Sequence, residues 1–483
     1  MAKFNLSSHI DSNKIFLVDR SELSGRLDPF YYQPEIAELE KKIKRISNKK
    51  LRDYIIRISS GATPSVKAEE KYYSDKENGI PFLRVQNLQT NSELSLDDVK
   101  YINKETHEGL LKRSQVEEND LLVKITGVGR MAIASVAPKG FIGNTNQHMV
   151  VIKTTSEDVS RYLASFLNLD ISEKLASRRA TGGTRPALDY PALKSIPIVE
   201  GVDFKILEEA EQQKKELDAR AKKLLGSIDD YLLGELGIKY KQYKANKYGI
   251  FSLNTENHEL FSFFTEKAQL KKRYDVQYYL PVYSKIAEEL KKSKYDLIKI
   301  KDVAISIQSG KAPKTFYEEG INYLKVRNIK DCEIDWDTDK INENDLDLQY
   351  VINIGDILFV TMGAGSLGKA TIYEDNILCQ YDPKITRFKL DKAQINNYYF
   401  LYLVRSNIYQ KLFEKEIRGS TGMTMLNPND IANIFIPLPP LKKQNEIANH
   451  IQSIRQKAKD LQTEGSKILE DAKHRIEQMI LKP

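Results

Sequence analysis

Residues 120–134 read DLLVKITGVGRMAIA, and residues 356–370 read DILFVTMGAGSLGKA. In both stretches an aspartate precedes a run of large apolar residues, and a Gly-x-Gly triplet follows at the same distance. Apolar runs bounded by glycine are typical of β-strands that enter a tight turn. The same hairpin pattern therefore occurs twice, about half a chain length apart.

Other segments repeat in the same order. Residues 26–32 (RLDPFYY) correspond to 273–279 (RYDVQYY), and residues 80–88 (IPFLRVQNL) correspond to 321–329 (INYLKVRNI). The offset falls from 247 to 236 residues between these segments and the hairpins, which indicates length differences in loops. Solenoid repeats have periods of about 20–50 residues. The much longer period here indicates two whole domains of one fold.

Each repeat has the same expected layout, in which an aromatic opening segment leads into a helix and short β-rich runs follow. Short strands separated by Gly, Asn and Pro predict mixed domains with more sheet than helix. We expect helices at 35–46 and 282–292, and strands at 120–125, 132–136, 149–152, 356–360, 370–373 and 385–390.

A highly charged stretch with helical periodicity ends each repeat. Steps of three and four residues between its apolar or small positions give the heptad pattern of a coiled coil. Two such stretches at equivalent places favour an antiparallel pair, a rod of ~45 Å or more at ~1.5 Å per residue. The alternative is a separate solvated amphipathic helix on each domain. The positions are Ala210, Leu217, Ala221, Leu224, Ile228 and Tyr231, with Lys214 interrupting them, and Ile451, Ile454, Ala458, Leu461, Gly465, Ile468, Ala472 and Met479.

These patterns predict an α+β chain of two tandem, pseudo-repeated mixed α/β domains, joined by two long helices that form an antiparallel coiled coil. The helical stretches 204–240 and 441–481 carry net charges of −1 and +2, so most of the overall +7 lies in the two domains. We therefore expect a spacer that carries two anion-binding modules. The expected segments are a first domain at 1–200, a central helix at 201–240, a second domain at 241–440 and a C-terminal helix at 441–483.

Composition excludes several classes of protein. The chain has 483 residues, of which 41% are hydrophobic, enough for two to four domains at ~100–200 residues each. Two cysteines rule out a disulfide framework. No apolar run approaches the ~20 residues of a membrane span, and the N-terminus lacks a secretory pattern. We expect a soluble cytoplasmic protein without a membrane partner, whose mild basic excess permits a nucleic-acid partner.

Each catalytic motif that the sequence suggests departs from its required pattern. Residues 363–369 have the spacing of a phosphate-binding loop, but Ala370 replaces the magnesium-binding Ser or Thr and a strand pattern follows. Residues 427–430 lack the second Pro and the aromatic residue of the amino-methyltransferase motif, and we expect a turn that starts a helix or strand. A loose match to a nuclease motif is formed by Glu35, Glu40 and Lys42, but helical spacing explains these residues as a charged face of a helix. The six histidines lack metal-ligand spacing. We expect no catalytic centre, metal or cofactor in this chain.

Taken together, the repeated segments resemble the specificity subunit of type I restriction–modification enzymes, along essentially the whole chain. The resemblance rests on the Arg-Leu-Asp-type openings and on the turns SGATP (60–64) and SGKAP (309–313). It rests also on the segments RVQN (84–87) and KVRN (325–328) and on the Gly-x-Gly hairpins. It is strongest at 419–444, where GSTGM leads to IPLPPL and the heptad helix. The first repeat departs from the pattern at 200–203, where a second Pro-Pro segment would be expected.

The resemblance implies that each domain is a target-recognition domain that reads one half of a split double-stranded DNA sequence. The paired helices would set the unread spacer between the halves, and this subunit would be catalytically silent. Two modification subunits would dock on the helices, bind S-adenosylmethionine and methylate adenines. Restriction subunits, with a translocase and nuclease that use ATP and Mg, would join that core.

Candidate DNA contacts are the basic, amide and hydroxyl side chains of the RVQN and KVRN segments and of glycine-flanked loops. Arg and Lys can bond guanine, Asn and Gln can bond adenine, and phosphate contacts supply affinity and register. The competing interpretation of each residue is a charged surface side chain without a ligand. Gln147 and Gln380 also align between repeats, and either a structural role or a DNA contact fits them. The candidates are Thr63, Arg84, Gln86, Asn87, Arg130, Thr184, Arg185, Lys311, Lys325, Arg327, Asn328, Arg418, Thr421 and Thr424.

Two other functions stay open. A duplicated DNA-binding regulator, or an antirestriction decoy, would work without methyltransferase subunits, and purification with or without such a partner distinguishes it. An ATP-dependent enzyme acting through residues 363–369 would require nucleotide binding that Lys369→Ala abolishes.

Overall fold

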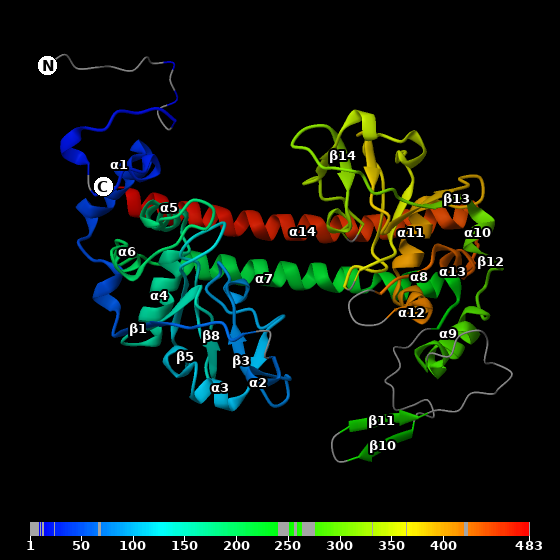
Figure 1. Cartoon of the computed structure of the whole chain (residues 1–483), viewed down its shortest axis with the longest axis horizontal. Coiled ribbons are helices and arrows are strands. Elements are labelled where there is room, and N and C mark those ends of the chain that lie inside the picture. The colour runs from blue at the N-terminus through cyan, green and yellow to red at the C-terminus, as the bar shows by residue number, and fades with distance from the viewer. Residues whose placement is uncertain are drawn as a thin grey trace. The chain divides into compact units, whose positions relative to one another are not determined.

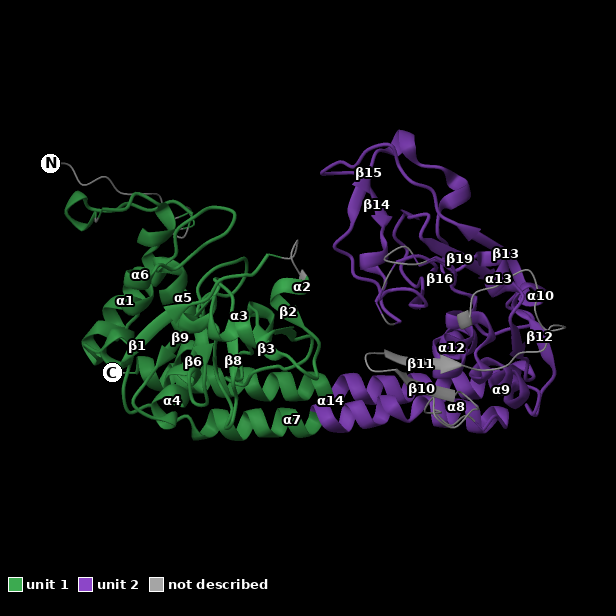
Figure 2. Cartoon of the chain, turned by 60° about the horizontal axis from the view of Figure 1, so that its bottom comes forward, with its two compact units in different colours: residues 1–217, 462–483 green, residues 218–461 purple. Residues whose placement is uncertain are grey.

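The structure is a computed structural model that divides into two compact units, residues 1–217 with 462–483 and residues 218–461 (Figure 2). Each unit holds one repeat and a section of each charged helical stretch, and each is described by itself. Residues 273–275, expected to open the second repeat, lie outside the described part of the chain. The described residues are 9, 11, 14–23, 25–65, 69–239, 251–255, 258–262, 276–330, 332–363, 365–419 and 424–482.

The first unit is built around an antiparallel sheet with both faces covered. Successive side chains of a strand point to opposite faces. Leu121 and Val123 of the central strand β6 accordingly join the core beneath the helices, whereas Leu122 joins a second core on the other face. Double coverage explains why this strand is apolar almost throughout instead of alternating. The strand order is β1-β9-β6-β7, which are Arg57–Ser60, Met149–Lys153, Leu121–Lys124 and Ala134–Val136.

The described residues of the first repeat also form a second sheet and the helices α1 to α6 (Figure 1). In this sheet β3 and β8 run parallel, with Phe82 opposite Asn144, and the other neighbours are antiparallel. Its order is β2-β4-β3-β8-β5, which are Tyr73–Ser74, Lys100–Ile102, Ile80–Leu83, Gly143–Thr145 and Gln115–Val116. The helices are α1 (Pro34–Ile46), α2 (Glu69–Tyr72), α3 (Lys104–Glu108), α4 (Glu157–Leu167), α5 (Asp170–Arg179) and α6 (Tyr190–Lys194).

The second unit repeats this strand order. Ile357 and Phe359 of β16 face the core beneath the helices, and Leu358 and Val360 face the other core, as in β6. The antiparallel sheet is β13-β19-β16-β17, which are Ala304–Ser309, Ile385–Leu390, Ile357–Val360 and Ala370–Ile372. The sheet with one parallel pair is β15-β14-β18, which are Asp339–Ile341, Ile321–Leu324 and Cys379–Tyr381.

The described residues of the second unit also form two strand pairs and the short helices α9 to α13. The strand pairs are β12 (Leu297–Lys299) with β20 (Phe435–Pro437), and β10 (Phe251–Thr255) with β11 (His258–Ser262). The helices are α9 (Pro281–Leu290), α10 (Ile300–Val303), α11 (Asn397–Arg405), α12 (Asn407–Glu416) and α13 (Pro428–Ala432).

The charged stretches form the helices α7 (Lys205–Gly226), α8 (Ile228–Leu236) and α14 (Leu441–Leu481). Within the first unit, Leu207 and Ala210 of α7 share a core with Ala472, Ile476 and Ile480 of α14. Lys214, which interrupts the heptad series, lies against Gly465, where an added Cβ would sit 3.3 Å from the Lys214 Cα. The missing side chain of Gly465 thus makes room for the lysine.

Within the second unit, the beginning of α14 packs against α8. Lys443 Nζ lies 2.6 Å from Glu235 Oε2, and the rings of Tyr231 and His450 are 4.1 Å apart. A later residue of α14 therefore contacts an earlier residue of α8, so the two helices pack antiparallel. No helix among the described residues has the length and apolar character needed to cross a membrane.

The mixed α/β character is confirmed, but the repeats contain more helix than expected. The expected helix at 35–46 is α1, and the expected strand at 120–125 is β6. The helices α4, α5, α11 and α12 were not expected. Two of them carry recognisable start signals, because Ser156 and Asn396 cap the first turns of α4 and α11 with their side chains. A single capping residue is a weaker signal than the many short β-rich runs around it, so the sequence did not predict these helices.

Candidate nucleic-acid interface

The RVQN and KVRN segments form the same tight turn in the two units. In each, a short 3₁₀ helix, η5 (Val85–Asn87) or η10 (Val326–Asn328), follows an inner strand. The Asn87 side chain is fully buried, and its Oδ1 accepts a hydrogen bond from the Arg84 backbone N–H at 2.8 Å. Asn328 is equally buried and accepts from the Lys325 N–H at 2.9 Å.

The amide nitrogens of these two asparagines bind the following loop. Asn87 Nδ2 donates to the carbonyl of Ser95, and Asn328 Nδ2 donates to the carbonyls of Asp335 and Asp337. A buried amide whose hydrogen bonds are made inside the protein stabilises its loop. Asn87 and Asn328, expected as base contacts, thus hold the turns, and their amides face the interior.

The other members of the two turns gather around one carboxylate each. In the first unit, Arg84 Nη2 lies 3.2 Å from Asp98 Oδ2, and Gln86 Nε2 donates to the same oxygen at 2.7 Å. In the second unit, Lys325 Nζ and Arg327 Nη2 lie 3.0 and 2.8 Å from Asp339 Oδ2. Four of the expected residues therefore form two equivalent donor pairs.

The aspartates were not expected, although the sequence carries a signal for them. Asp98 follows Gln86 by 12 residues, and Asp339 follows Arg327 by 12 residues. This shared spacing becomes visible only when the loops after the repeated turns are aligned as well.

The SGATP and SGKAP loops pass close to a neighbouring strand. A Cβ on Gly61 would lie 1.6 Å from the carbonyl oxygen of Thr145, and one on Gly310 would lie 2.0 Å from that of Tyr381. Only glycine permits this approach. After the first loop, the Thr63 hydroxyl donates to the exposed side chain of Gln147.

After the second loop, Lys311 Nζ pairs with Asp347 at 2.9 Å. Gln380 is buried, and its Oε1 accepts a hydrogen bond from the Asp347 N–H at 2.9 Å. Gln380 thus has a structural role and orients the carboxylate that holds Lys311. The Lys311 side chain is half exposed and remains accessible to a ligand.

The Gly-x-Gly hairpins lie beside the loops that hold the remaining candidates. A bridge joins Thr126 to Ala187 in the first unit, and one joins Met362 to Met425 in the second. Thr184 and Arg185 are exposed in the loop before Ala187. In the equivalent loop, Arg418 Nη2 lies 2.6 Å from Asp430, Thr424 is partly buried, and Thr421 lies outside the described residues.

Arg130 has a structural role. Its guanidinium lies 2.5 Å from Asp170 Oδ1 and donates to the carbonyl of Asn168 at 2.5 Å. Its side chain is 23% exposed. The glycine beside Arg130 in the hairpin suggested a side chain available to DNA. Instead, the side chain binds residues at the junction of α4 and α5. Its surroundings therefore do not support the expected DNA contact.

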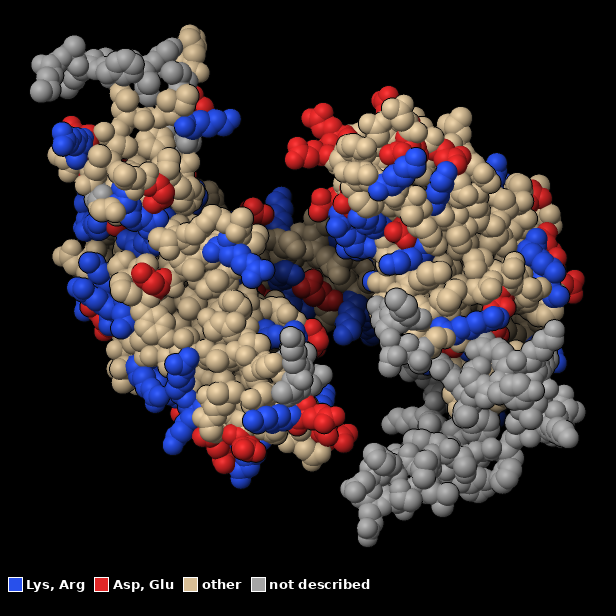
Figure 3. All heavy atoms as spheres, viewed as in Figure 1, with Lys and Arg blue, Asp and Glu red and all other residues tan. Residues whose placement is uncertain are grey.

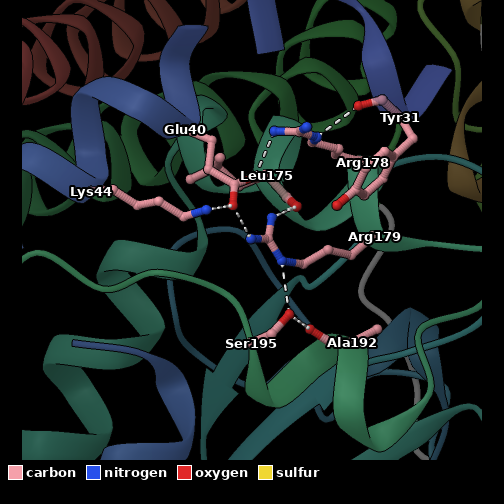
Figure 4. A network of polar contacts seen from close by, with 8 residues as sticks. All are labelled: Tyr31, Glu40, Lys44, Leu175, Arg178, Arg179, Ala192 and Ser195. Atoms are coloured by element: carbon pink, nitrogen blue, oxygen red, sulfur yellow. Dashed lines mark hydrogen bonds and ion pairs between the residues drawn. The ribbon is translucent and has the colours of Figure 1, made fainter. Parts of the chain in front are cut away.

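A polar network of the first unit surrounds Glu40 (Figure 4). Glu40 bonds Arg178 at 2.7 Å, Arg179 at 2.8 Å and Lys44 at 2.9 Å, and its side chain is 9% exposed. The charged face expected from helical spacing is therefore a largely buried ion-pair network at Glu40. Burial raises its pKa, but the attraction of the three cations outweighs burial and holds the pKa below its usual range. The network joins α1 to α5.

Glu40→Gln should destabilise the first unit by about 3 kcal/mol, because it leaves two largely covered arginines, Arg178 and Arg179, without their counter-charge. Urea unfolding of the full chain measures this. Glu38→Gln, an exposed position on the same helix, is the control and should change the free energy of unfolding little. Because the pKa of Glu40 is lowered, its contribution is present at neutral pH and is lost as the pH falls through that lowered value. Equal effects of the two variants would contradict a structural role of the network.

Basic and acidic side chains are interspersed on the face drawn in Figure 3. The described part of the chain contains no cluster of three or more residues able to hold a metal ion. The strand β17 begins at Ala370, directly after the glycine-rich stretch 363–369, as expected for a hairpin and not for a phosphate-binding loop. Asn427 caps α13, which confirms a turn that starts a helix.

Residues 292–470 match the family described as Type I restriction modification DNA specificity domain. The chain is 25% identical over 437 residues to the type I restriction enzyme MjaVIII specificity subunit of Methanocaldococcus jannaschii, covering 88% of this chain and 90% of that relative. It is 25% identical over 140 residues to the EcoBI specificity subunit of Escherichia coli, covering 28% and 29%. A crystal structure of a type I S subunit from M. genitalium aligns with a TM-score of 0.37 and 14% identity, covering 90% and 95%.

Proposed function

We propose that this chain is a specificity subunit of a type I restriction–modification system, and that each of its repeats reads one half of a bipartite DNA target. The match of residues 292–470 to the specificity-domain family and the similarity to the MjaVIII specificity subunit support this proposal. Specificity subunits are the non-catalytic components of such systems and act on DNA. The observation that carries the proposal is the recurrence of one donor-bearing turn, η5 and η10, in both repeats.

The chemistry of the two turns suits base reading. Each inner strand ends in a turn that its buried asparagine stabilises, and each turn carries two hydrogen-bond donors. Arginine can make two hydrogen bonds to guanine and glutamine can make two to adenine in the major groove. Thr63, Lys311, Thr184, Arg185 and Arg418 in the neighbouring loops would add phosphate contacts, which supply affinity and register.

We further propose that α7, α8 and α14 pair along their length and set the distance between the half-sites. Two features support this. The beginning of α14 contributes Ile447 and Ile451 to the core of the second unit, and its end contributes Ala472 and Ile476 to the core of the first. The helix is continuous between these sections and spans 41 residues, which is ~60 Å at ~1.5 Å per residue.

The same helices would dock two modification subunits. In the proposed complex those subunits bind S-adenosylmethionine, and restriction subunits bind ATP and Mg, so this chain itself needs no cofactor. Sequencing the modified bases of a host that carries the chain and its modification subunits tests the function. One split motif with modified adenines in both halves is expected, and it should disappear when the gene for this chain is deleted. Persistence of the motif would contradict the proposal.

Arg327→Ala should lower the affinity for the target duplex by roughly 1–3 kcal/mol and relax discrimination at one base pair, if Arg327 contacts a base edge. Its side chain is 58% exposed and already oriented by Asp339. Fluorescence anisotropy with target and unrelated duplexes measures both effects. Lys330→Ala, an exposed cation in the same loop, is the control. Unchanged affinity at low and high salt would remove Arg327 from the interface.

A further inference from the structure

We propose that Asp98 and Asp339 are specificity-determining residues that hold the two donor pairs and keep them from binding DNA phosphates indiscriminately. This inference rests on the proposed function and names residues that act against incorrect sequences. Its basis is an arrangement that occurs twice, once in each unit, and is built from different donors: Arg84 with Gln86 in the first unit, and Lys325 with Arg327 in the second.

In each unit one carboxylate oxygen serves both donors. Asp98 Oδ2 is 2.7 Å from Gln86 Nε2 and 3.2 Å from Arg84 Nη2. Asp339 Oδ2 is 3.0 Å from Lys325 Nζ and 2.8 Å from Arg327 Nη2. The same arrangement with different donors indicates that the carboxylate, and not a particular donor, is the shared feature of the two turns.

The aspartates are not the residues that form the turns. Asn87 and Asn328 do so from the interior, and the Asp98 side chain is 82% exposed. Arg84 is also held independently of the carboxylate, since its Nη2 donates to the Asp98 backbone carbonyl at 2.7 Å. Lys325 Nζ likewise lies 3.7 Å from the centre of the Phe316 ring. Removing either carboxylate charge should therefore leave Arg84 and Lys325 near their present places.

A carboxylate at this position penalises the wrong ligand. A phosphate is anionic, so it must displace the carboxylate from the donors and is repelled while approaching it. Correct base edges instead offer acceptors in a fixed geometry, such as the O6 and N7 of guanine, which carry no net charge and are repelled by the carboxylate far less than a phosphate is. Specificity is a difference of affinities, and a repulsive element increases it by weakening the competitor.

The test uses the full chain, purified with the subunits that accompany it, and two duplexes of equal length: one carries the motif found by modified-base sequencing, and one has both half-sites scrambled. The variants are Asp98→Asn and Asp339→Asn, with Asp97→Asn and Asp337→Asn as matched controls. The control aspartates are exposed close neighbours, and their variants change the charge by the same amount. Asn suits position 98, where φ is +51°, because it tolerates the left-handed region. Asp98→Gly, which suits this φ as well, is a second variant in case Asp98→Asn folds poorly.

Asp98→Asn should raise the affinity for the scrambled duplex by about three- to fivefold, as expected for an exposed charge interaction. Asp339→Asn should raise it at least as much, because the Asp339 side chain is only 24% exposed and solvent screens its charge less. Both gains should shrink at high salt. Affinity for the target should rise less, so that discrimination falls. Discrimination equal to that of the control variants would overturn the inference alone. Failure of the unaltered chain to distinguish the two duplexes would instead overturn the proposed function.

Discussion

Inserting one heptad after Leu217 and one after Leu461 should shift the preferred spacer between the half-sites to about three base pairs more. Seven residues lengthen a helix by ~10.5 Å and keep its apolar seam in phase, and DNA rises ~3.4 Å per base pair. The two insertion points suit this design because they lie nearly opposite each other. Lys214 of α7 packs on Gly465 of α14. Because the helices run in opposite directions, Leu217, three residues after Lys214, lies near Gln462, three residues before Gly465.

The accompanying rotation about the duplex, roughly 100° for three base pairs at ~10.5 per turn, could prevent both domains from binding at once. A longer spacer and a loss of binding are therefore both consistent with paired helices that hold the two domains at a fixed distance. Duplex selection from a library of spacer lengths distinguishes them. An unchanged spacer preference at full affinity would contradict the proposal that the helices set the distance between the half-sites. A matched control inserts four residues at each point, which takes the seam out of phase and should reduce stability instead of shifting the spacer.

The repeated turns could be located from sequence because their residues are neighbours in the chain. The pattern of apolar strand, basic residue and amide is local, and it recurs at 83–87 and 324–328. Their carboxylate partners lie beyond a loop of different residues in each repeat, and a pattern confined to the turn does not include them. The role of Asn87 and Asn328 also could not be predicted, since a polar residue after a strand is as compatible with the interior of a turn as with its surface.

Glu40 shows the same limit more strongly. Its partners Arg178 and Arg179 are 138 and 139 residues away in the chain. Helical spacing alone places Glu40 on a charged face of its helix, and only the packing of α5 on α1 shows that it is buried. The heptad interruption at Lys214 is a further example, because its compensation by Gly465 requires knowledge of which residues face each other. Local periodicity predicts elements well, whereas the environment of a charge depends on distant packing.

Replacing residues 26–200 with the corresponding domain of a related specificity subunit should change one half-site completely and leave the other intact. The first unit has its own core, which supports independent reading. The original half-site should lose its contribution to binding, a decrease of about 10³-fold or more on the scale that separates specific from non-specific DNA affinity. Modified-base sequencing of hosts that carry the chimera reveals both half-sites in one experiment.

The structure also identifies what such a chimera must retain. The core of the first unit includes Leu207 and Ala210 of α7 and Ala472 and Ile476 of α14, so the incoming domain must present an apolar face to them. Glu477 Oε1 in addition accepts hydrogen bonds from the first N–H groups of α5. A matched chimera that exchanges 1–217 together with 462–483 keeps these contacts within one parent and should fold at least as stably. If both half-sites changed together in either chimera, reading by the two repeats would not be independent, because an exchange confined to one core would have altered the contacts of the other.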